Sequence, residues 1–198
     1  MVREKIIREA MHLFKQYGFR SVSMNMIADE LHISKRTIYM EFENKEQVIV
    51  ACEELEISRL EQGLARYEQE AENALDALVR AAVCIWQYRA SCSPAFFRDV
   101  VRYPEIQEGI RQFKFRLEKR FTALFEQGAQ QGLIQPGAEY EVVAQAFASQ
   151  SEQIKSEYQP GMSLTFLRGI CTEEGGREIE RLTQSMNLNQ VKLHTKIS

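Results

Sequence analysis

Five side chains between residues 35 and 40 have the chemistry of a surface that binds nucleic acid. They are Lys35, Arg36, Thr37, Tyr39 and Met40: two cations, a hydroxyl, an aromatic with a polar tip and a methionine. In a major groove, cations meet phosphates and guanine edges, and a hydroxyl or methyl group meets other base edges. A helix that carries these residues outward is suited to lie in such a groove.

Two short helices joined by a tight turn are predicted to position these side chains. Ser23 can cap the first helix, because its hydroxyl can accept a hydrogen bond from a free amide of the first turn, and Ser34 can cap the second. Apolar residues recur at helical spacing in both helices, and Ile33 in the turn should point into the core between them. The apolar positions are Ile27, Ala28, Leu31, Ile38 and Phe42. The pattern is typical of a helix-turn-helix.

Two longer helices are predicted to flank this motif. A helix over residues 3–18 ends at Gly18, which tolerates the left-handed conformation of a helix end. A helix capped by Asn44 continues to about residue 70. Lys45 lies in its first turn, where the partial positive charge of the helix end disfavours a cation. A phosphate bound there would explain this misfit.

The same residues also fit a protein that does not bind DNA. Short amphipathic helices separated by a turn occur in many all-α proteins, and a charged outer face is usually solvated. The net charge is -3, and residues 1–50 hold eight Lys or Arg against seven Asp or Glu. Any contact with DNA must therefore come from a local patch, because the overall charge does not favour a polyanion.

The composition favours helix throughout the chain. Of the 198 residues, 44% are hydrophobic and 27% charged, as in an ordinary globular protein, and only four are proline. No alternating segment with hairpin turns predicts a strand, so the fold class is all-α. No apolar run approaches the roughly 18 residues of a membrane helix, and the charged N-terminus differs from a signal peptide. We expect a cytoplasmic protein with no membrane partner.

No pattern predicts an enzyme, a metal site or a cofactor. The four cysteines, Cys52, Cys84, Cys92 and Cys171, are scattered without a CxxC pair or a histidine cluster. Reduced structural thiols are therefore favoured over a disulfide framework or a zinc site. No glycine-rich phosphate-binding loop is present, and the three histidines have no acid-base partner at a suggestive spacing.

The first 50 or so residues resemble the TetR family of bacterial transcriptional repressors. The residues that carry the resemblance are Ala10, Leu13, Phe14, Gly18 and Phe19, then Ser23, Ile27 and Ala28, then residues 33–39, and finally Phe42, Lys45 and Glu46. The resemblance implies a three-helix DNA-binding domain over residues 1–47. It also implies a helical effector-binding and dimerisation domain over residues 48–198, with about nine or ten helices in all.

Two positions depart from the family pattern. The family usually has glycine where His32 stands, and histidine adopts a left-handed turn only at some cost. Glu41 stands where the family often has His or Tyr near the DNA. Its carboxylate would repel a phosphate, although it could accept from a cytosine amine. We expect instead a salt bridge from Glu41 to a neighbouring cation.

Two helical regions near the C-terminus are candidates for the dimer interface. A helix over residues 139–158, closed by Gln159-Pro160-Gly161, carries one apolar stripe, and a last helical region begins at Ser163. That region is predicted to be interrupted or kinked at Gly175-Gly176 and to end near Leu188. The two regions would pair across a two-fold axis as a four-helix interface, although an intrachain core explains the same stripe.

Seven aromatic residues are candidates for an effector pocket, since pockets between helices are largely apolar. They are Trp86, Tyr88, Phe96, Phe97, Tyr103, Phe113 and Phe147. Aromatic residues at helical spacing also form ordinary core, so these seven residues fit either an effector pocket or the core of the protein.

These observations together predict a ligand-responsive transcriptional regulator. We expect a repressor that binds a pseudo-palindromic DNA operator as a homodimer and is released by an unidentified small molecule. Ser23, Ser34, Lys35, Arg36, Thr37, Tyr39, Met40 and Lys45 are the predicted DNA-binding residues. The alternative is a ligand-binding or scaffold protein that keeps a degenerate helix-turn-helix without binding DNA.

Overall fold

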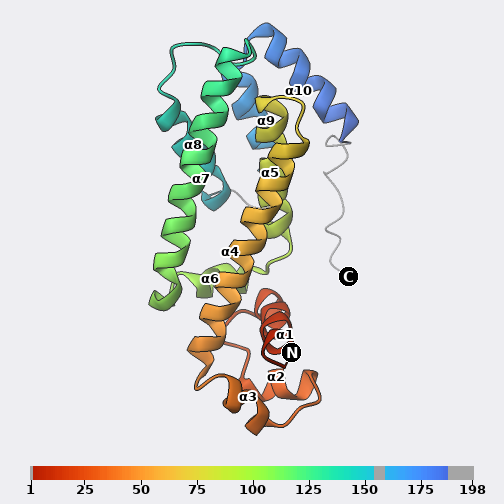
Figure 1. Cartoon of the computed structure of the whole chain (residues 1–198), viewed down its shortest axis with the longest axis vertical. Helices are drawn as coiled ribbons and strands as arrows, with labels where there is room; N and C mark the ends of the chain where they lie inside the picture. Colours follow the sequence, from red (N-terminus) through yellow and green to blue (C-terminus); the bar gives the residue numbers. More distant parts are fainter. Residues whose placement is uncertain (1, 154–158, 187–198) are drawn as a thin grey trace. The chain divides into compact units, whose positions relative to one another are not determined.

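The chain folds into α-helices. The computed structural model describes residues 2–153 and 159–186, and in these residues it contains ten helices and no strand (Figure 1). The all-α class and the predicted number of helices are therefore confirmed. The helices are α1 (Val2–Tyr17), α2 (Met24–Glu30), α3 (Lys35–Glu41), α4 (Lys45–Glu70), α5 (Ala74–Ala90), α6 (Pro94–Val100), α7 (Pro104–Gln130), α8 (Tyr140–Gln153), α9 (Gln159–Ile170) and α10 (Glu173–Ser185).

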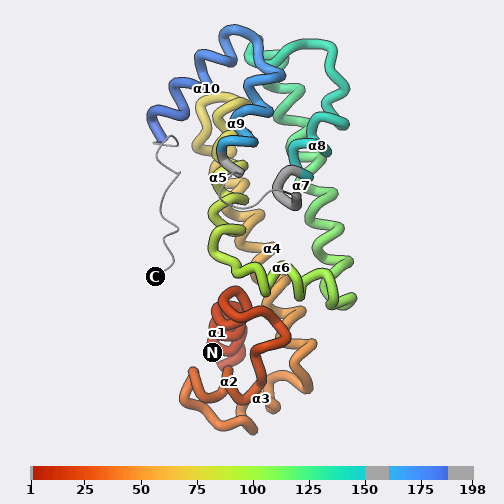
Figure 2. The backbone as a smooth tube through the Cα atoms, turned by 180° about the vertical axis from the view of Figure 1, so that it is seen from behind, coloured from red at the N-terminus to blue at the C-terminus, as the bar shows by residue number. Residues whose placement is uncertain are grey.

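The helices are divided between two compact units. The N-terminal unit consists of Met1–Arg59 and Ser91–Phe113, and the C-terminal unit consists of Leu60–Ala90 and Lys114–Ser198. The backbone trace in Figure 2 shows that α4 and α7 are each continuous helices, so each contributes residues to both units. The predicted domain boundary between residues 47 and 48 stays a prediction, and the compact units divide the chain at other positions.

The N-terminal unit has a single apolar core. Residues from α1, α2, α3, the start of α4 and α6 are buried in it, with Ile6, Phe14, Ile27, Ile38 and Ile49 almost fully enclosed. The spacing of these residues is the helical spacing that the sequence shows, since each helix buries one face. Helices α1 and α2 of this core pack directly against α3.

A group of phenylalanine rings packs together in the core of the C-terminal unit. Phe147 of α8 lies 5.1 Å from Phe121 and 5.7 Å from Phe125, both on α7, measured between ring centroids. Its ring also lies 5.7 Å from that of Phe166 on α9. The two pairs with α7 are edge-to-face, an arrangement that stabilises a core beyond the area it buries.

Two predicted boundaries in the C-terminal unit are wrong. Gln159-Pro160-Gly161 does not close a helix but begins α9, because proline is accepted in a first helical turn, where no amide partner is lost. The last helical region breaks at Cys171 and not at the glycine pair, since Thr172 caps α10 by accepting a hydrogen bond from the Gly175 amide at 3.1 Å. Residues 154–158 and the predicted end at Leu188 lie outside the described residues.

Gly175 is needed for packing and not for a kink. A Cβ atom at this position would stand 1.9 Å from the Leu133 carbonyl oxygen. The Leu133 carbonyl also accepts a hydrogen bond from the Thr172 amide at 3.1 Å. The start of α10 therefore lies directly against the segment that follows α7.

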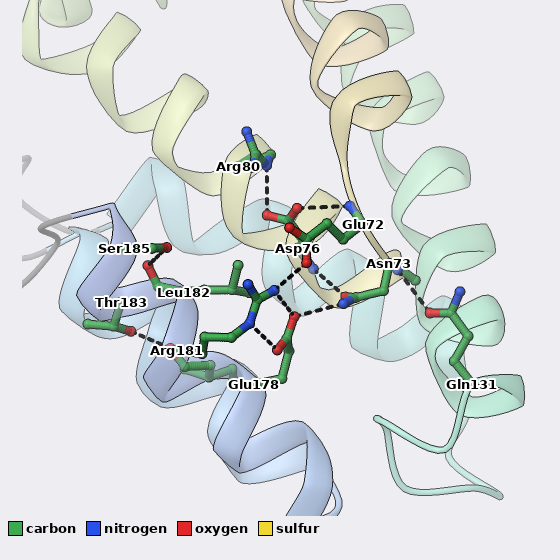
Figure 3. Close-up of polar contacts among 12 residues, drawn as sticks. Glu72, Asn73, Asp76, Arg80, Gln131, Glu178, Arg181, Leu182, Thr183 and Ser185 are labelled. Carbon is green, nitrogen blue, oxygen red and sulfur yellow. Dashed lines mark hydrogen bonds and ion pairs between the residues drawn. The ribbon is translucent and has the colours of Figure 1, made fainter.

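A polar cluster joins α10 to the turn between α4 and α5 (Figure 3). The fully buried Asp76 carboxylate accepts from Arg80 Nε at 2.7 Å and from the Glu72 amide at 3.0 Å. Arg181 of α10 donates at 2.7 Å to both Glu178 and Glu72. Hydrogen bonding from Arg181 lowers the pKa of Glu178, opposed in part by desolvation. Each of these charged groups has a partner within the cluster.

No helix in the described part of the chain is long and apolar enough to cross a membrane. Among residues 2–153 and 159–186, no three His, Cys, Asp or Glu side chains gather where they could hold a metal ion.

Candidate nucleic-acid interface

The predicted caps of the two short helices are confirmed. Ser23 Oγ accepts a hydrogen bond from the Met26 amide at 3.2 Å, and Ser34 Oγ accepts from the Thr37 amide at 3.1 Å. Ile33 packs against the core of the N-terminal unit, as predicted. These contacts fix where α3 begins and how it leaves the turn.

His32 takes the left-handed conformation that usually favours glycine. Its φ is +53°, and no other residue in the described segments except three glycines has a positive φ. Its amide donates to the Asp29 carbonyl at 3.1 Å, and the Ile33 amide donates to the Ala28 carbonyl at 3.0 Å. The turn therefore keeps its hydrogen bonds with histidine in a left-handed conformation that costs a β-carbon-bearing residue about 1 kcal/mol.

The five side chains predicted to face DNA lie on α3 around its outer side. Ile38 is fully buried, whereas Lys35 and Arg36 are exposed and Thr37 is half-buried. Tyr39 is 45% exposed and Met40 is 77% exposed. Neither Lys35 nor Arg36 forms an ion pair with any residue that the structure describes. The two cations are thus available to an external anion.

Two of the predicted contact residues also hydrogen-bond to each other. The hydroxyl oxygens of Ser34 and Thr37 are 2.8 Å apart. Both side chains remain at the surface, so the pair orients two hydroxyl groups at the start of α3. The Lys35 ammonium lies 5.7 Å from the centre of the Tyr39 ring, one helical turn further along α3.

The expected salt bridge to Glu41 is wrong. The Glu41 carboxylate forms no ion pair within the described residues, and Arg3 of α1 donates instead to the Glu41 carbonyl oxygen at 2.9 Å. The Arg3 guanidinium also lies 4.1 Å from the centre of the buried Phe42 ring. Because the last carbonyls of a helix have no partner inside the helix, Arg3 satisfies one of them and anchors the C-terminal end of α3.

Lys45 has partners within the protein. Its Nζ donates to the Phe19 carbonyl at 2.9 Å and to the Val22 carbonyl at 3.1 Å. Two carbonyl oxygens therefore offset the unfavourable position of a cation at the first turn of α4 without a phosphate. An ammonium has three donors, so one N–H direction is left for another acceptor.

Asp99 is a buried structural residue that supports the site and that the sequence did not reveal. It lies on α6, is 4% exposed, and its carboxylate accepts a hydrogen bond from the Arg20 amide at 2.8 Å. A Cβ atom at Gly18, whose φ is +81°, would stand 2.7 Å from the same carboxylate. Helix α6 therefore belongs to the unit that carries α2 and α3. No local pattern signals a contact over 79 residues.

The seven predicted pocket residues are not gathered in one unit. Trp86, Tyr88 and Phe147 belong to the C-terminal unit, and the other four belong to the N-terminal unit. Phe96, Phe97 and Tyr103 pack against the core there, with the Phe96 ring 5.1 Å from that of Phe19. For these three residues the structure shows ordinary core, and a pocket lined by the seven stays a prediction.

The N-terminal part of the chain matches a known family of proteins. Residues 6–52 match the model of the bacterial regulatory proteins of the tetR family. An uncharacterised HTH-type transcriptional regulator of Bacillus subtilis, YvaF, is 30% identical over 102 residues. That match covers 50% of this chain and 53% of the relative, so it spans about half the length of each.

Solved structures share the fold over most of the chain. A TetR-family regulator from Marinobacter aquaeolei superposes with a TM-score of 0.73 at 20% identity, covering 93% of this chain and 98% of that one. A regulator from Saccharomonospora viridis, solved in complex with choline, has a TM-score of 0.65 at 17% identity, covering 95% of this chain and 96% of that one. Residues 6–52 thus match the tetR family, as the residue pattern predicted, and the fold of most of the chain is shared with solved TetR-family regulators.

Proposed function

We propose that the protein is a DNA-binding transcriptional repressor that recognises a pseudo-palindromic operator as a homodimer. The observation that carries this proposal is the outer face of α3, where Lys35 and Arg36 are exposed without an ion pair among the described residues. Opposite them Ile38 and Phe42 anchor α3 in the core. A helix presented in this way can enter a major groove, where its cations meet guanine edges and phosphates.

Each predicted contact residue has a proposed role. Arg36 and Lys35 read base edges, and Met40 lies beside Arg36 on the outer face. Thr37, Tyr39, Ser23 and Lys45 bind phosphates, and Ser34 orients the Thr37 hydroxyl. Lys45 reaches a phosphate with the one donor that its two carbonyl partners leave.

A homodimer is proposed because one short helix reads only a few base pairs. Two copies of α3 related by a two-fold axis can bind half-sites about 34 to 36 Å apart. The proposed interface pairs α8 with the helices that follow it, α9 and α10, as a four-helix arrangement.

Release by a small molecule completes the proposal. The C-terminal unit is the proposed effector-binding part, and the choline bound by the Saccharomonospora viridis protein supports a small-molecule ligand for this fold. An effector that binds one conformation better than the other would shift the population away from the DNA-binding state. Helix α4 contributes residues to both units, so it is the proposed element that transmits the change.

A footprint tests the proposal directly. The purified full-length protein is incubated at low salt with the DNA upstream of its own gene, and protection from nuclease is mapped. We expect a protected site with two-fold symmetry, and we expect the variant Arg36→Ala to need a higher protein concentration for the same protection. Absence of protection for the unaltered protein would favour the alternative, a ligand-binding or scaffold protein with a degenerate helix-turn-helix.

A further inference from the structure

Met40 is the most exposed large apolar side chain in the described part of the molecule. It is 77% exposed, above Val101 at 72% and Phe115 at 58%. Its neighbour in sequence, Tyr39, is 45% exposed and has Lys35 beside its ring. The Met40 side chain buries little apolar area, so it contributes little to the stability of the fold.

The geometry of α3 places Met40 at the centre of the outer face. Successive residues of an α-helix are about 100° apart around the helix axis. Arg36 and Met40, which lie two residues before and two residues after Ile38, therefore each point within roughly 20° of the direction opposite to Ile38. Ile38 is fully buried and fixes the inward direction. Arg36 and Met40 therefore point away from the core together, one helical turn apart.

The flanks of this face have different chemistry. Lys35 and Tyr39 lie on one side of the Arg36 and Met40 row, and Thr37 and Glu41 lie on the other. The apolar Met40 is thus one helical turn from the Arg36 cation on the same row, and a second cation, Lys35, lies on the flank beside Tyr39. A polyanion is the partner that complements this arrangement, since a purely apolar partner would have to desolvate both cations.

We propose that Met40 determines operator specificity by contacting the 5-methyl group of a thymine. This inference rests on the proposed DNA-binding function. The only apolar group that a base pair presents in the major groove is that methyl, and an unbranched thioether can pack against it. Four residues span about 6 Å along a helix, and base pairs are about 3.4 Å apart. The thymine therefore lies within about two base pairs of the guanine bound by Arg36.

The test removes a single methyl group from the DNA. Binding sites are first selected from random duplexes with the full-length protein, and each thymine of one half-site is then replaced by uracil, which keeps every hydrogen-bonding group. We expect one uracil substitution to weaken binding about threefold to fivefold, the effect of one buried methyl group. In Met40→Ala the same substitution should change binding by less than about 1.5-fold, and in Met40→Leu the sensitivity should persist, because an apolar side chain remains.

A second arm distinguishes the methyl group from the rest of the base. A C·G pair at the sensitive position should weaken binding, and 5-methylcytosine in its place should restore part of the affinity in the unaltered protein but not in Met40→Ala.

The outcomes separate this inference from the function on which it rests. If no sequence is enriched in the selection, the proposed DNA-binding function is overturned. If a site is enriched but no uracil substitution matters, or if the uracil effect survives in Met40→Ala, the role of Met40 is overturned and DNA binding stands.

Discussion

The outer face of α3 and the polar cluster at α10 use cations in opposite ways. Arg80 and Arg181 each donate to carboxylates within the C-terminal unit, and the Asp76 carboxylate is fully buried. Lys35 and Arg36 form no ion pair within the described residues. A cation whose charge is satisfied inside the protein stabilises the fold, whereas an exposed cation without a partner contributes little to stability. The difference separates structural charges from candidate DNA contacts.

Asp76→Ala should give the largest change in stability. The substitution leaves the Glu72 amide and the Arg80 guanidinium without their buried acceptor, which we expect to cost about 2 to 3 kcal/mol in the free energy of unfolding. Urea denaturation measures the loss. The matched control Asp76→Asn keeps an acceptor oxygen and should lose less. Equal losses for both variants would contradict the role of the charge.

Arg36→Ala should change DNA binding and leave stability unaltered. We expect a loss of about 1 to 3 kcal/mol in binding to the selected site, with relaxed sequence preference. The control Arg8→Ala removes the same charge from an ion pair on α1 and should bind nearly as the unaltered protein does. Binding to specific and random duplexes is compared at one salt concentration. Equal losses on both duplexes would show that Arg36 does not read bases.

Lys45→Met tests a residue that resembles both kinds of cation. Lys45 is hydrogen-bonded within the protein, like Arg80 and Arg181, and it is also a proposed DNA contact, like Lys35 and Arg36. Losing the hydrogen bonds to Phe19 and Val22 should lower the free energy of unfolding by about 1 kcal/mol. Losing a phosphate contact should also weaken binding to all sequences and flatten the salt dependence by about one charge per monomer. Lower stability with an unchanged salt slope would make Lys45 a structural residue only.

We expect Glu178 to make the free energy of unfolding slightly dependent on pH in the acid range. Its pKa is lowered in the folded protein from a reference of 4.5, chiefly by the hydrogen bond from Arg181. The stabilisation is therefore fully present above about pH 4.5 and is lost as the pH falls through the lower, folded-state pKa. Glu178→Gln should remove this part of the acid dependence, which we expect to be under about 1 kcal/mol. Denaturation at neutral and acid pH measures it, with Glu180→Gln as the control on the exposed side of α10.

Local signals predicted most of the helix-turn-helix. Ser23, Ser34 and Gly18 have the roles that their residue types favour, because a cap or a left-handed helix end depends on a few neighbouring residues. The side of α3 that faces outward was also predictable, since helical spacing alone fixes it.

Contacts over long sequence distances were not predictable. Arg3 binds the Glu41 carbonyl 38 residues away, and Asp99 binds the Arg20 amide 79 residues away. The glycine at 175 suggested a kink for a local reason, but the Leu133 carbonyl requires a residue without a side chain there. Such constraints come from another part of the chain, so no local pattern contains them.

The sequence by itself determined the fold class, the family match of residues 6–52 and the face of α3 that is exposed. These depend on the order and spacing of apolar residues, which fix how each helix buries one side. Only the tertiary structure decided which cations are already satisfied. Lys45 and Arg3 are bound by carbonyl oxygens, while Lys35 and Arg36 project from α3 without an ion pair in the described segments. The physical reason is that a cation's partners are set by which backbone oxygens the fold brings within about 3 Å.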